Sequence, residues 1–397
     1  MALKNNTWKL NQWYDQSVAG NISYTGAKQL WAWGYNNKGQ LGQNSKTAYS
    51  SPVQIPGVFS KGSDIGDVSV GDYMVGTIKS DNTLWVWGEN GNGQLGQNNR
   101  TDYSSPVQVG SSADWEFVEM GMNYMAAIKT DGTLWMWGNQ GANPNGVLGQ
   151  NQGTTEYSSP VQIHGGGTNW RNIECSIVNV FATKTDGTMW VWGGQNDAGN
   201  LGLNEGGGWS AHMKSSPTQL PGTTWSRAST NNYSVAATKT DGTLWAWGIN
   251  NYGGLGQNVN GAPGSRSSPV QVGSGTDWAI VQHDNNAGVI ALKTDGTLWS
   301  WGYNQQGNLG HNNRTNYSSP KQIPGTTWSK VAGNIGGFFA MKTDGTMWGW
   351  GQNTYGGLGQ NNETYYSSPV QVGSDTDWVS IFGGPNGNRG IVGIKDV

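Results

Sequence analysis

One five-residue pattern occurs seven times in this chain of 397 residues and constrains its fold more than any other feature. Each copy has leucine or methionine, then tryptophan, any residue, tryptophan and glycine. Successive copies lie 49 to 55 residues apart. A fixed period of that length is typical of repeat architectures, in which neighbouring units share a core. The tryptophan pairs are Trp31/Trp33, Trp85/Trp87, Trp135/Trp137, Trp190/Trp192, Trp245/Trp247, Trp299/Trp301 and Trp348/Trp350.

Each repeat predicts four short strands. Tryptophans two residues apart share one face of a strand, whereas on a helix they would diverge by about 200°. Lys-Thr-Asp-Gly-Thr precedes five of the pairs, and Asp-Gly between apolar segments predicts a hairpin. Asn82 replaces the glycine in one copy and tolerates the same positive φ. A Leu-Gly loop and then Ser-Ser-Pro follow each pair, and proline can begin a strand. Seven such units predict an all-β, seven-bladed β-propeller with four-stranded blades.

The two ends of the chain indicate how the ring closes. The segment from Trp378 to Lys395 has the character of two strands, but the chain stops at Val397, where their hairpin partner should begin. We expect residues 30–33 to be that partner, so that the C-terminal strands join the first blade and remove free edges. Residues 28–397 then form the propeller. Residues 1–27, with Trp8, Trp13 and Tyr14, form an N-terminal arm or attachment segment, or alternatively supply the missing strands locally.

The composition excludes several classes of function. Charged residues make up 12% of the chain and the formal net charge is -3, so no basic stripe is available for nucleic acid. Residues 1–23 contain no apolar run, so we expect neither membrane insertion nor signal-dependent export. The single cysteine, Cys175, is expected to be a small buried residue.

No pattern in the chain predicts catalysis. The histidines lie far apart, without a second histidine or a cysteine at ligand spacing, so we expect no metal and no cofactor. The repeated aspartates are assigned to turns, and no nucleophile has a recognisable base partner. We therefore expect no catalytic residues and a non-enzymatic protein. The histidines are His164, His212, His283 and His311.

Tyrosines in front of Ser-Ser-Pro form the most suggestive candidate surface. They could stack on sugars or form a protein-binding rim, or each could pack over its own loop. Arg100 and Arg314 precede two of them by three residues. In the two units without this tyrosine, irregular loops at 204–214 and 259–266 predict an asymmetric contact. The tyrosines are Tyr49, Tyr103, Tyr157, Tyr317 and Tyr366, and the irregular loops contain Trp209, His212 and Arg266.

The succession Asp-Gly-Thr-Leu-Trp-x-Trp-Gly, Gly-x-Leu-Gly and Ser-Pro-x-x-Val resembles the repeat of the regulator of chromosome condensation family. The resemblance extends from about Gly26 to the C-terminus and implies the seven-bladed propeller fold of that family. It does not imply one function, because the family includes exchange factors, inhibitors and other proteins.

The opening Asn-Asn-Thr-Trp-Lys-Leu-Asn-Gln-Trp-Tyr-Asp-Gln and the polar, Gly- and Asn-rich composition are similar to repeat proteins among bacteriophage structural genes. This resemblance implies a non-enzymatic structural or adhesion component of a virion: a capsid decoration, fibre or tail-associated protein. Its partners would be other virion proteins and a glycan or protein on the host surface. The alternatives are an extracellular carbohydrate-binding or inhibitory propeller and a cytoplasmic guanine-nucleotide exchange factor for a small GTPase.

Overall fold

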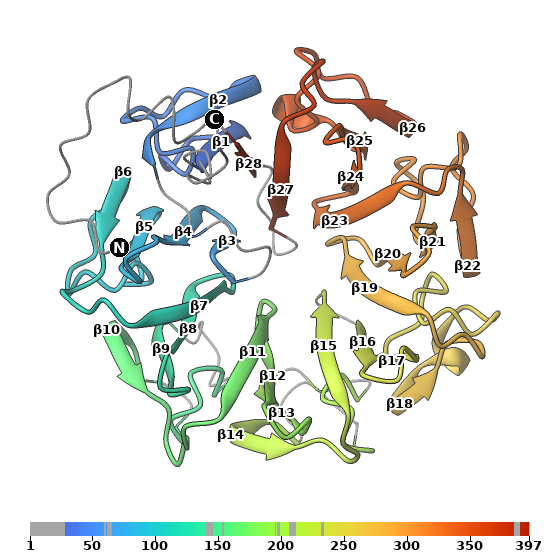
Figure 1. The fold of residues 1–397 in the computed structure, drawn as a ribbon. Coiled ribbons are helices and arrows are strands. Elements are labelled where there is room, and N and C mark those ends of the chain that lie inside the picture. The colour runs from blue at the N-terminus through green and yellow to red at the C-terminus, as the bar shows by residue number, and fades with distance from the viewer. Residues whose placement is uncertain are drawn as a thin grey trace, which may run out of the picture.

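The computed structural model describes residues 28–58, 61, 66–139, 146–152, 155–194, 196, 199–205, 212–231, 234–384 and 390–396. Within them, seven four-stranded antiparallel sheets stand around a central axis (Figure 1). The predicted all-β, seven-bladed propeller is confirmed. Two short 3-10 helices, η1 (Ala262–Gly264) and η2 (Thr354–Gly356), interrupt the loops. Trp8, Trp13 and Tyr14 lie outside the described residues, so the attachment arm stays a prediction.

Six sheets are meanders in chain order, from the innermost to the outermost strand. Their strands are β3 (Val68–Val70), β4 (Met74–Ile78), β5 (Leu84–Gly88) and β6 (Tyr103–Gln108); β7 (Trp115–Met120), β8 (Tyr124–Lys129), β9 (Leu134–Gly138) and β10 (Tyr157–Gln162); β11 (Trp170–Cys175), β12 (Asn179–Lys184), β13 (Met189–Gly193) and β14 (Lys214–Gln219); β15 (Trp225–Thr230), β16 (Ser234–Lys239), β17 (Leu244–Gly248) and β18 (Arg266–Gln271); β19 (Trp278–His283), β20 (Gly288–Lys293), β21 (Leu298–Gly302) and β22 (Tyr317–Ile323); β23 (Trp328–Asn334), β24 (Gly337–Lys342), β25 (Met347–Gly351) and β26 (Tyr366–Gln371).

The seventh sheet is built from both ends of the chain. Its order is β2 (Tyr49–Val58), β1 (Gln29–Gly34), β28 (Gly390–Lys395) and β27 (Trp378–Gly383). Leu30 pairs with Ile394 in the antiparallel register of β1 and β28, which lie side by side in Figure 1. The predicted closure by C-terminal strands is confirmed. The alternative, in which N-terminal residues supply the missing strands, is wrong because β27 and β28 occupy those positions.

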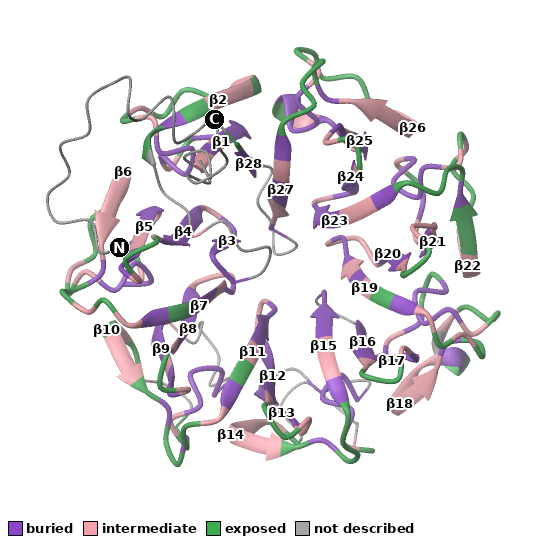
Figure 2. Cartoon of the chain, in the orientation of Figure 1, coloured by how far each residue is buried: buried purple, intermediate pink, exposed green. Residues whose placement is uncertain are grey.

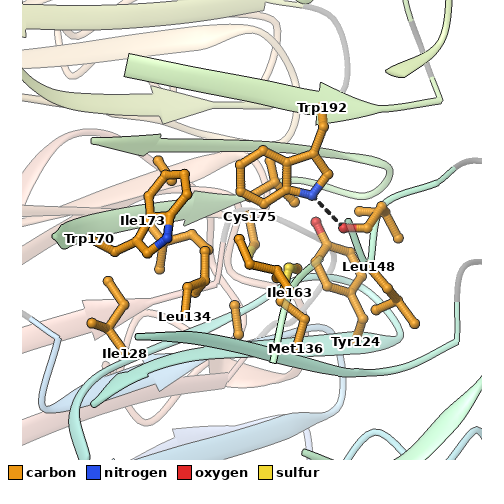
Figure 3. Close-up of a cluster of buried hydrophobic side chains, with 14 of the residues drawn as sticks. Tyr124, Ile128, Leu134, Met136, Leu148, Ile163, Trp170, Ile173, Cys175 and Trp192 are labelled. Carbon is orange, nitrogen blue, oxygen red and sulfur yellow. Dashed lines mark hydrogen bonds between the residues drawn. The ribbon is translucent and has the colours of Figure 1, made fainter. Parts of the chain in front are cut away.

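The second tryptophan of each pair fills the interface between two blades. All seven of these side chains are fully buried, whereas the first tryptophans are half-buried. In Figure 3, Trp192 of β13 lies among Leu134, Leu148 and other side chains of the preceding blade. The Nε1 atom of Trp301 donates to the Gly254 carbonyl oxygen at 2.9 Å, across the interface. Equivalent bonds join Trp33 to Gly357, Trp87 to Gln40, Trp192 to Val147, Trp247 to Asn200 and Trp350 to Asn308.

A backbone hydrogen bond also crosses every interface. An asparagine after each Leu-Gly has a positive φ and donates its amide to the carbonyl of a serine in the Ser-Ser-Pro strand of the next blade. The glycine before it has no room for a side chain: a Cβ on Gly310 would lie 2.9 Å from Nε1 of Trp350. The bonded pairs are Asn44–Ser104, Asn98–Ser158, Asn151–Ser215, Asn204–Ser267, Asn258–Ser318, Asn312–Ser367 and Asn361–Ser50.

The hairpin turns are fixed by a short relay of side chains. In the turn after β16, Asp241 Oδ1 accepts from the amide and hydroxyl of Thr243, whose Oγ1 accepts from Nε1 of Trp245. These bonds lower the pKa of the Asp241 carboxyl. Lys239 places its ammonium 4.6 Å and 4.3 Å from the ring centroids of Trp225 and Trp245. The aspartate relay recurs at Asp81, Asp131, Asp186, Asp295 and Asp344.

We predict that Trp301→Phe destabilises the propeller more than Trp299→Phe does. Trp301→Phe leaves the Gly254 carbonyl unpaired at a dry interface and removes packed volume, which costs about 2 to 4 kcal/mol. Trp299 is half-buried and bonds only to Thr297 Oγ1 of its own turn, so its replacement costs about 1 kcal/mol. Urea denaturation measures both values. Equal losses would contradict the role given to the indole bond between blades.

Candidate functional site

The connections between strands divide the ring into two faces. Alternate connections of an antiparallel meander lie at the same end of the sheet. The short turns after each innermost strand and the long loops after each Trp-x-Trp strand therefore share one face, which we call the loop face. The Asp-Gly hairpins and the links between blades share the opposite turn face. In Figure 2 the exposed residues gather mainly in these connections, whereas the outermost strands are mostly half-buried.

Buried asparagines hold the long loops in one conformation. Asn250 is fully buried, accepts from the Leu255 amide at 3.0 Å and donates to the Val259 carbonyl at 2.8 Å. The asparagine fills the inside of the loop and pairs its backbone groups, so the outward side chains stand on a fixed backbone. The same bond to the leucine amide is made by Asn36, Asn90, Asn196, Asn304 and Asn353.

These loops present the most exposed aromatic side chains of the described residues. Tyr252, Tyr355 and Tyr365 are 44%, 41% and 40% exposed, and all three follow a Trp-x-Trp strand. Exposed tyrosine combines a large apolar surface with a hydroxyl that can bond to a partner, and it is enriched at protein interfaces. The loop face is therefore the candidate binding surface.

The loop-face tyrosines form two clusters at blade interfaces. The Tyr35 and Tyr355 ring centroids lie 4.6 Å apart, and Tyr73, in the short turn before β4, lies 6.2 Å from Tyr35. Tyr252 and Tyr303 form the second cluster at 5.0 Å. These residues were not predicted from the sequence. The available signal was the departure from the repeat, since Trp-Gly-Tyr occurs only at Tyr35 and Tyr303.

The tyrosines singled out from the sequence lie elsewhere, at the start of the outermost strands. All five are half-buried. Three accept a hydrogen bond from an asparagine of their own loop: Tyr103 from Asn99 at 3.0 Å, Tyr317 from Asn313 at 3.1 Å and Tyr366 from Asn362 at 3.1 Å. This geometry matches the alternative in which each tyrosine packs over its own loop. A binding role for Tyr49, Tyr103, Tyr157, Tyr317 and Tyr366 stays a prediction.

The predicted arginines lie near this rim in different settings. Arg100 pairs with Glu156 of the next blade at 2.6 Å, in an exposed ion pair that contributes little to stability. Arg314 is exposed at the equivalent position. Arg266 begins β18 and donates to the carbonyls of Pro263 and Ser265, so it closes its own loop.

The irregular loops belong to adjacent blades, as the asymmetric-contact hypothesis requires. His212 has a positive φ of 70° and its Nδ1 lies 3.9 Å from Glu205 Oε2. The same carboxylate lies 2.9 Å from Lys214 Nζ. Trp209 falls outside the described residues, so its part in the contact stays a prediction.

The axial channel holds charged side chains that were not among the residues predicted from the sequence. Glu119 and Glu174 occupy the same repeat position on β7 and β11, and they line one cavity of about 190 Å³ with Arg227 and Lys330. Burial, together with the Glu174 charge, raises the pKa of Glu119 well above its usual value. Burial raises the pKa of Glu174 to about 7, although Arg227 and the Thr230 amide favour its charged form. The signal for this pair was its fixed distance from Trp115 and Trp170.

The remaining predictions concern the cysteine, metal sites, membrane spans and the histidines. Cys175 is buried, as expected. Within the described ranges, no group of three or more histidine, cysteine, aspartate and glutamate side chains is arranged to hold a metal ion. In the same part of the chain, no helix has the length and apolar character needed to span a bilayer. Burial lowers the pKa of His283 to about 3, so its ring is neutral.

The fold and its repeating contacts define a tandem-repeat seven-bladed propeller. Four segments, residues 29–78, 81–128, 295–333 and 344–388, match the model of the regulator of chromosome condensation (RCC1) repeat. These four segments are similar to the RCC1 repeat, in agreement with the resemblance that the motifs indicated.

Known proteins are similar to this chain over about three quarters of its length. The Arabidopsis thaliana Ultraviolet-B receptor UVR8 is 26% identical over 74% of the chain, which spans 65% of that protein. The mitochondrial RCC1 domain-containing protein RUG3 of the same plant is 28% identical over 76% of the chain and 72% of its own length. The human E3 ubiquitin-protein ligase HERC2 matches at 24% identity, but over only 6% of its length.

Solved structures share the fold at low identity. Prp20p from Saccharomyces cerevisiae superposes with a TM-score of 0.79 at 15% identity, covering 94% of this chain and 92% of Prp20p. Human WBSCR16 gives 0.78 at 19% identity, covering 93% and 99%. Prp20p has binding properties toward Gsp1p and histones. At these identities the similarity concerns the fold alone.

We predict that Glu174→Gln stabilises the protein increasingly as the pH rises. The folded chain keeps a proton on Glu174 that the unfolded chain, with a pKa near 4.5, releases. The stability contributed by the neutral carboxyl is complete below about pH 4.5 and is lost as the pH rises through about 7. Melting temperatures of wild type and variant are compared at several pH values. His283 has a lowered pKa and so gives the opposite pH dependence, but it is present in both proteins and cancels in the difference.

The exposed residue Glu363 provides a matched control for this experiment. Glu363→Gln reports the effect of removing a carboxylate outside the channel. A Glu174→Gln difference that stays constant between acidic and alkaline pH would contradict the burial of an ionisable Glu174.

Proposed function

We propose that the protein is a non-enzymatic binding propeller whose loop face contacts another protein. The observation that carries the proposal is the pair of tyrosine clusters on loops that buried asparagines hold in place. Rigid aromatic side chains give contact area at a small cost in conformational entropy, and tyrosine is frequent among the residues that dominate binding energy. The binding of Prp20p to Gsp1p and histones is support by analogy of fold.

As the more specific part of the proposal, the partner is another virion protein, and the protein is located in the virion as a structural or adhesion component. Its support is the resemblance of the polar, Gly- and Asn-rich sequence and its opening segment to phage structural repeat proteins. Quantitative mass spectrometry of purified particles tests this part. A stoichiometric amount in the particle is expected, and its absence from washed particles would overturn the virion role while leaving the binding face intact.

Site-specific photo-crosslinking tests the binding face. A benzophenone side chain in place of Tyr355 should cross-link one protein species in the assembled particle, because Tyr355 is exposed beside Tyr35. The same group in place of Ser111, an exposed residue of a turn-face link, should not cross-link that species. Cross-linking from Ser111 but not from Tyr355 would place the interface on the other face.

A loss-of-contact variant completes this test. Tyr355→Ser removes the exposed ring and should weaken partner binding by about tenfold or more, which corresponds to about 1.4 kcal/mol. Ser111→Ala is the control, and calorimetry with the cross-linked partner measures both. Unchanged affinity in Tyr355→Ser would remove the basis of the proposal.

The exposed tyrosine rings also favour a carbohydrate-binding function as a second candidate, since aromatic faces stack on sugars. A glycan array probed with purified protein separates the two candidates. Specific glycan signals lost in Tyr355→Ser would favour the carbohydrate-binding alternative. The exchange-factor alternative has the fold of Prp20p as its support, and a nucleotide-release assay with a small GTPase tests it.

A further inference from the structure

The blade of β19–β22 departs from the repeat at three neighbouring positions. Ser300 stands between its two tryptophans, where the other blades have alanine, valine, methionine or glycine. His311 follows its Leu-Gly, where five blades have glutamine and one has leucine. Lys321 follows Ser-Ser-Pro, where the others have valine or threonine. The remaining blades show what the repeat requires at these positions, so the three polar residues are not needed to build a blade.

The three residues belong to one connected cluster. The buried hydroxyl of Ser300 donates to the Leu309 carbonyl at 2.7 Å and lies 3.0 Å from Nε2 of His311. Because the serine proton is engaged, His311 Nε2 is the donor in that contact, and Nδ1 is left as an acceptor. Burial and the charge of Lys321 lower the pKa of His311 to about 4, so its ring is neutral at pH 7. Lys321 Nζ donates to Tyr317 Oη at 2.8 Å, and the His311 and Tyr317 rings meet edge to face at 5.3 Å.

Two members of this cluster, His311 and Lys321, line a groove of about 440 Å³ between β22 and the next blade. Trp348 and Trp328 provide an aromatic surface, and Pro324 and Pro369 extend it. Lys321 and Lys342 both line the groove. Among the described residues, no aspartate or glutamate lines it. The groove therefore combines a planar apolar surface with two ammonium groups.

An equivalent groove four blades earlier in the chain lacks this charge. It has a volume of about 550 Å³ and is lined at the matching positions by Gln97, Trp115, Lys129 and Trp135. Its lysine forms an ion pair with Asp114 at 3.2 Å, whereas Thr327 stands at that position beside Lys342. Val107 takes the position of Lys321, and Gln97 donates to the Gln108 carbonyl instead of contacting a serine. The two grooves share their shape and differ in charge.

We propose that the groove between β22 and the following blade binds a small organic anion with a planar apolar body. The body lies against Trp348 and the prolines, and the acidic group faces Lys321 and Lys342. A partly dry wall strengthens the attraction between an ammonium and an anion, and the neutral His311 ring offers Nδ1 as an acceptor for a donor on the ligand. Carboxylates and phosphates share the required charge. This inference does not depend on the proposed function of the loop face.

Calorimetric titration of the full chain tests the inference with 2-naphthoate, 2-naphthyl phosphate and the neutral 2-naphthalenemethanol. At least one of the anions should bind with one molecule per chain. The neutral compound should bind at least about tenfold more weakly. The tighter of the two anions identifies the acidic group as carboxylate or phosphate. No heat from either anion at millimolar concentration would overturn the proposal, as would equal binding of the neutral compound.

Two variants assign the binding to this groove. Lys321→Val restores the residue of the other blades, so it should fold normally and lose about tenfold in affinity. Val107→Lys places a lysine in the matched groove, where Asp114 offsets Lys129, and should leave stoichiometry and affinity unchanged. Unchanged binding by Lys321→Val would overturn the assignment. If Val107→Lys bound a second molecule, Asp114 would not prevent anion binding in the matched groove. The inference that an unpaired Lys342 is needed for binding would then be overturned.

Discussion

The propeller depends on a contact that no single blade can make, the hydrogen bond from a buried indole to a backbone carbonyl of the preceding blade. Burial of so many tryptophans drives the sheets together, but apolar area has no direction. The Nε1 donor adds direction, because leaving it unpaired at a dry interface costs more than the bond contributes when formed. Trp301 must meet Gly254 at a fixed angle, and this orients the two blades. Five other indoles make the same bond, whereas Trp137 packs at its interface without one. The backbone bonds from asparagine to serine fix the outer part of the same interface.

The two faces of the ring use polar side chains for different purposes. On the turn face, the aspartate relay and the lysine between two indoles are nearly identical from blade to blade, and the charges are mostly satisfied within the repeat. On the loop face, buried asparagines satisfy the backbone, so the outward residues are free to differ. Tyr35 and Tyr303 follow Trp-Gly, where Glu89 and Gln352 stand in other blades. Variation is concentrated where the framework does not need a particular side chain.

The fold could be predicted from the sequence because its determinants are local and repeated. The spacing of the tryptophans indicated strands, Asp-Gly indicated hairpins, and the unpaired C-terminal segment indicated the strand exchange of the first blade. The binding surfaces were harder to predict, because contacts between blades join residues about 50 positions apart in the sequence. Tyr103 and Tyr317 stand at a recurring position that predicted a binding surface, yet their hydroxyls bond to their own loops. Tyr355, Glu174 and Lys321 gain their significance from neighbours in other strands or blades, which the repeat pattern did not show.

The pairing of β1 with β28 has a consequence for how the molecule forms during synthesis. The blades that follow β2 can assemble one after another as the ribosome makes them, since each needs only its predecessor. The blade that contains β1 and β2 lacks half of its sheet until β28 has been made, so it waits with one strand edge unpaired. Closure joins segments separated by more than 350 residues, and such non-local strand pairing forms slowly. Ring formation is therefore a late event, and the opened molecule is the form most exposed to pairing with another chain.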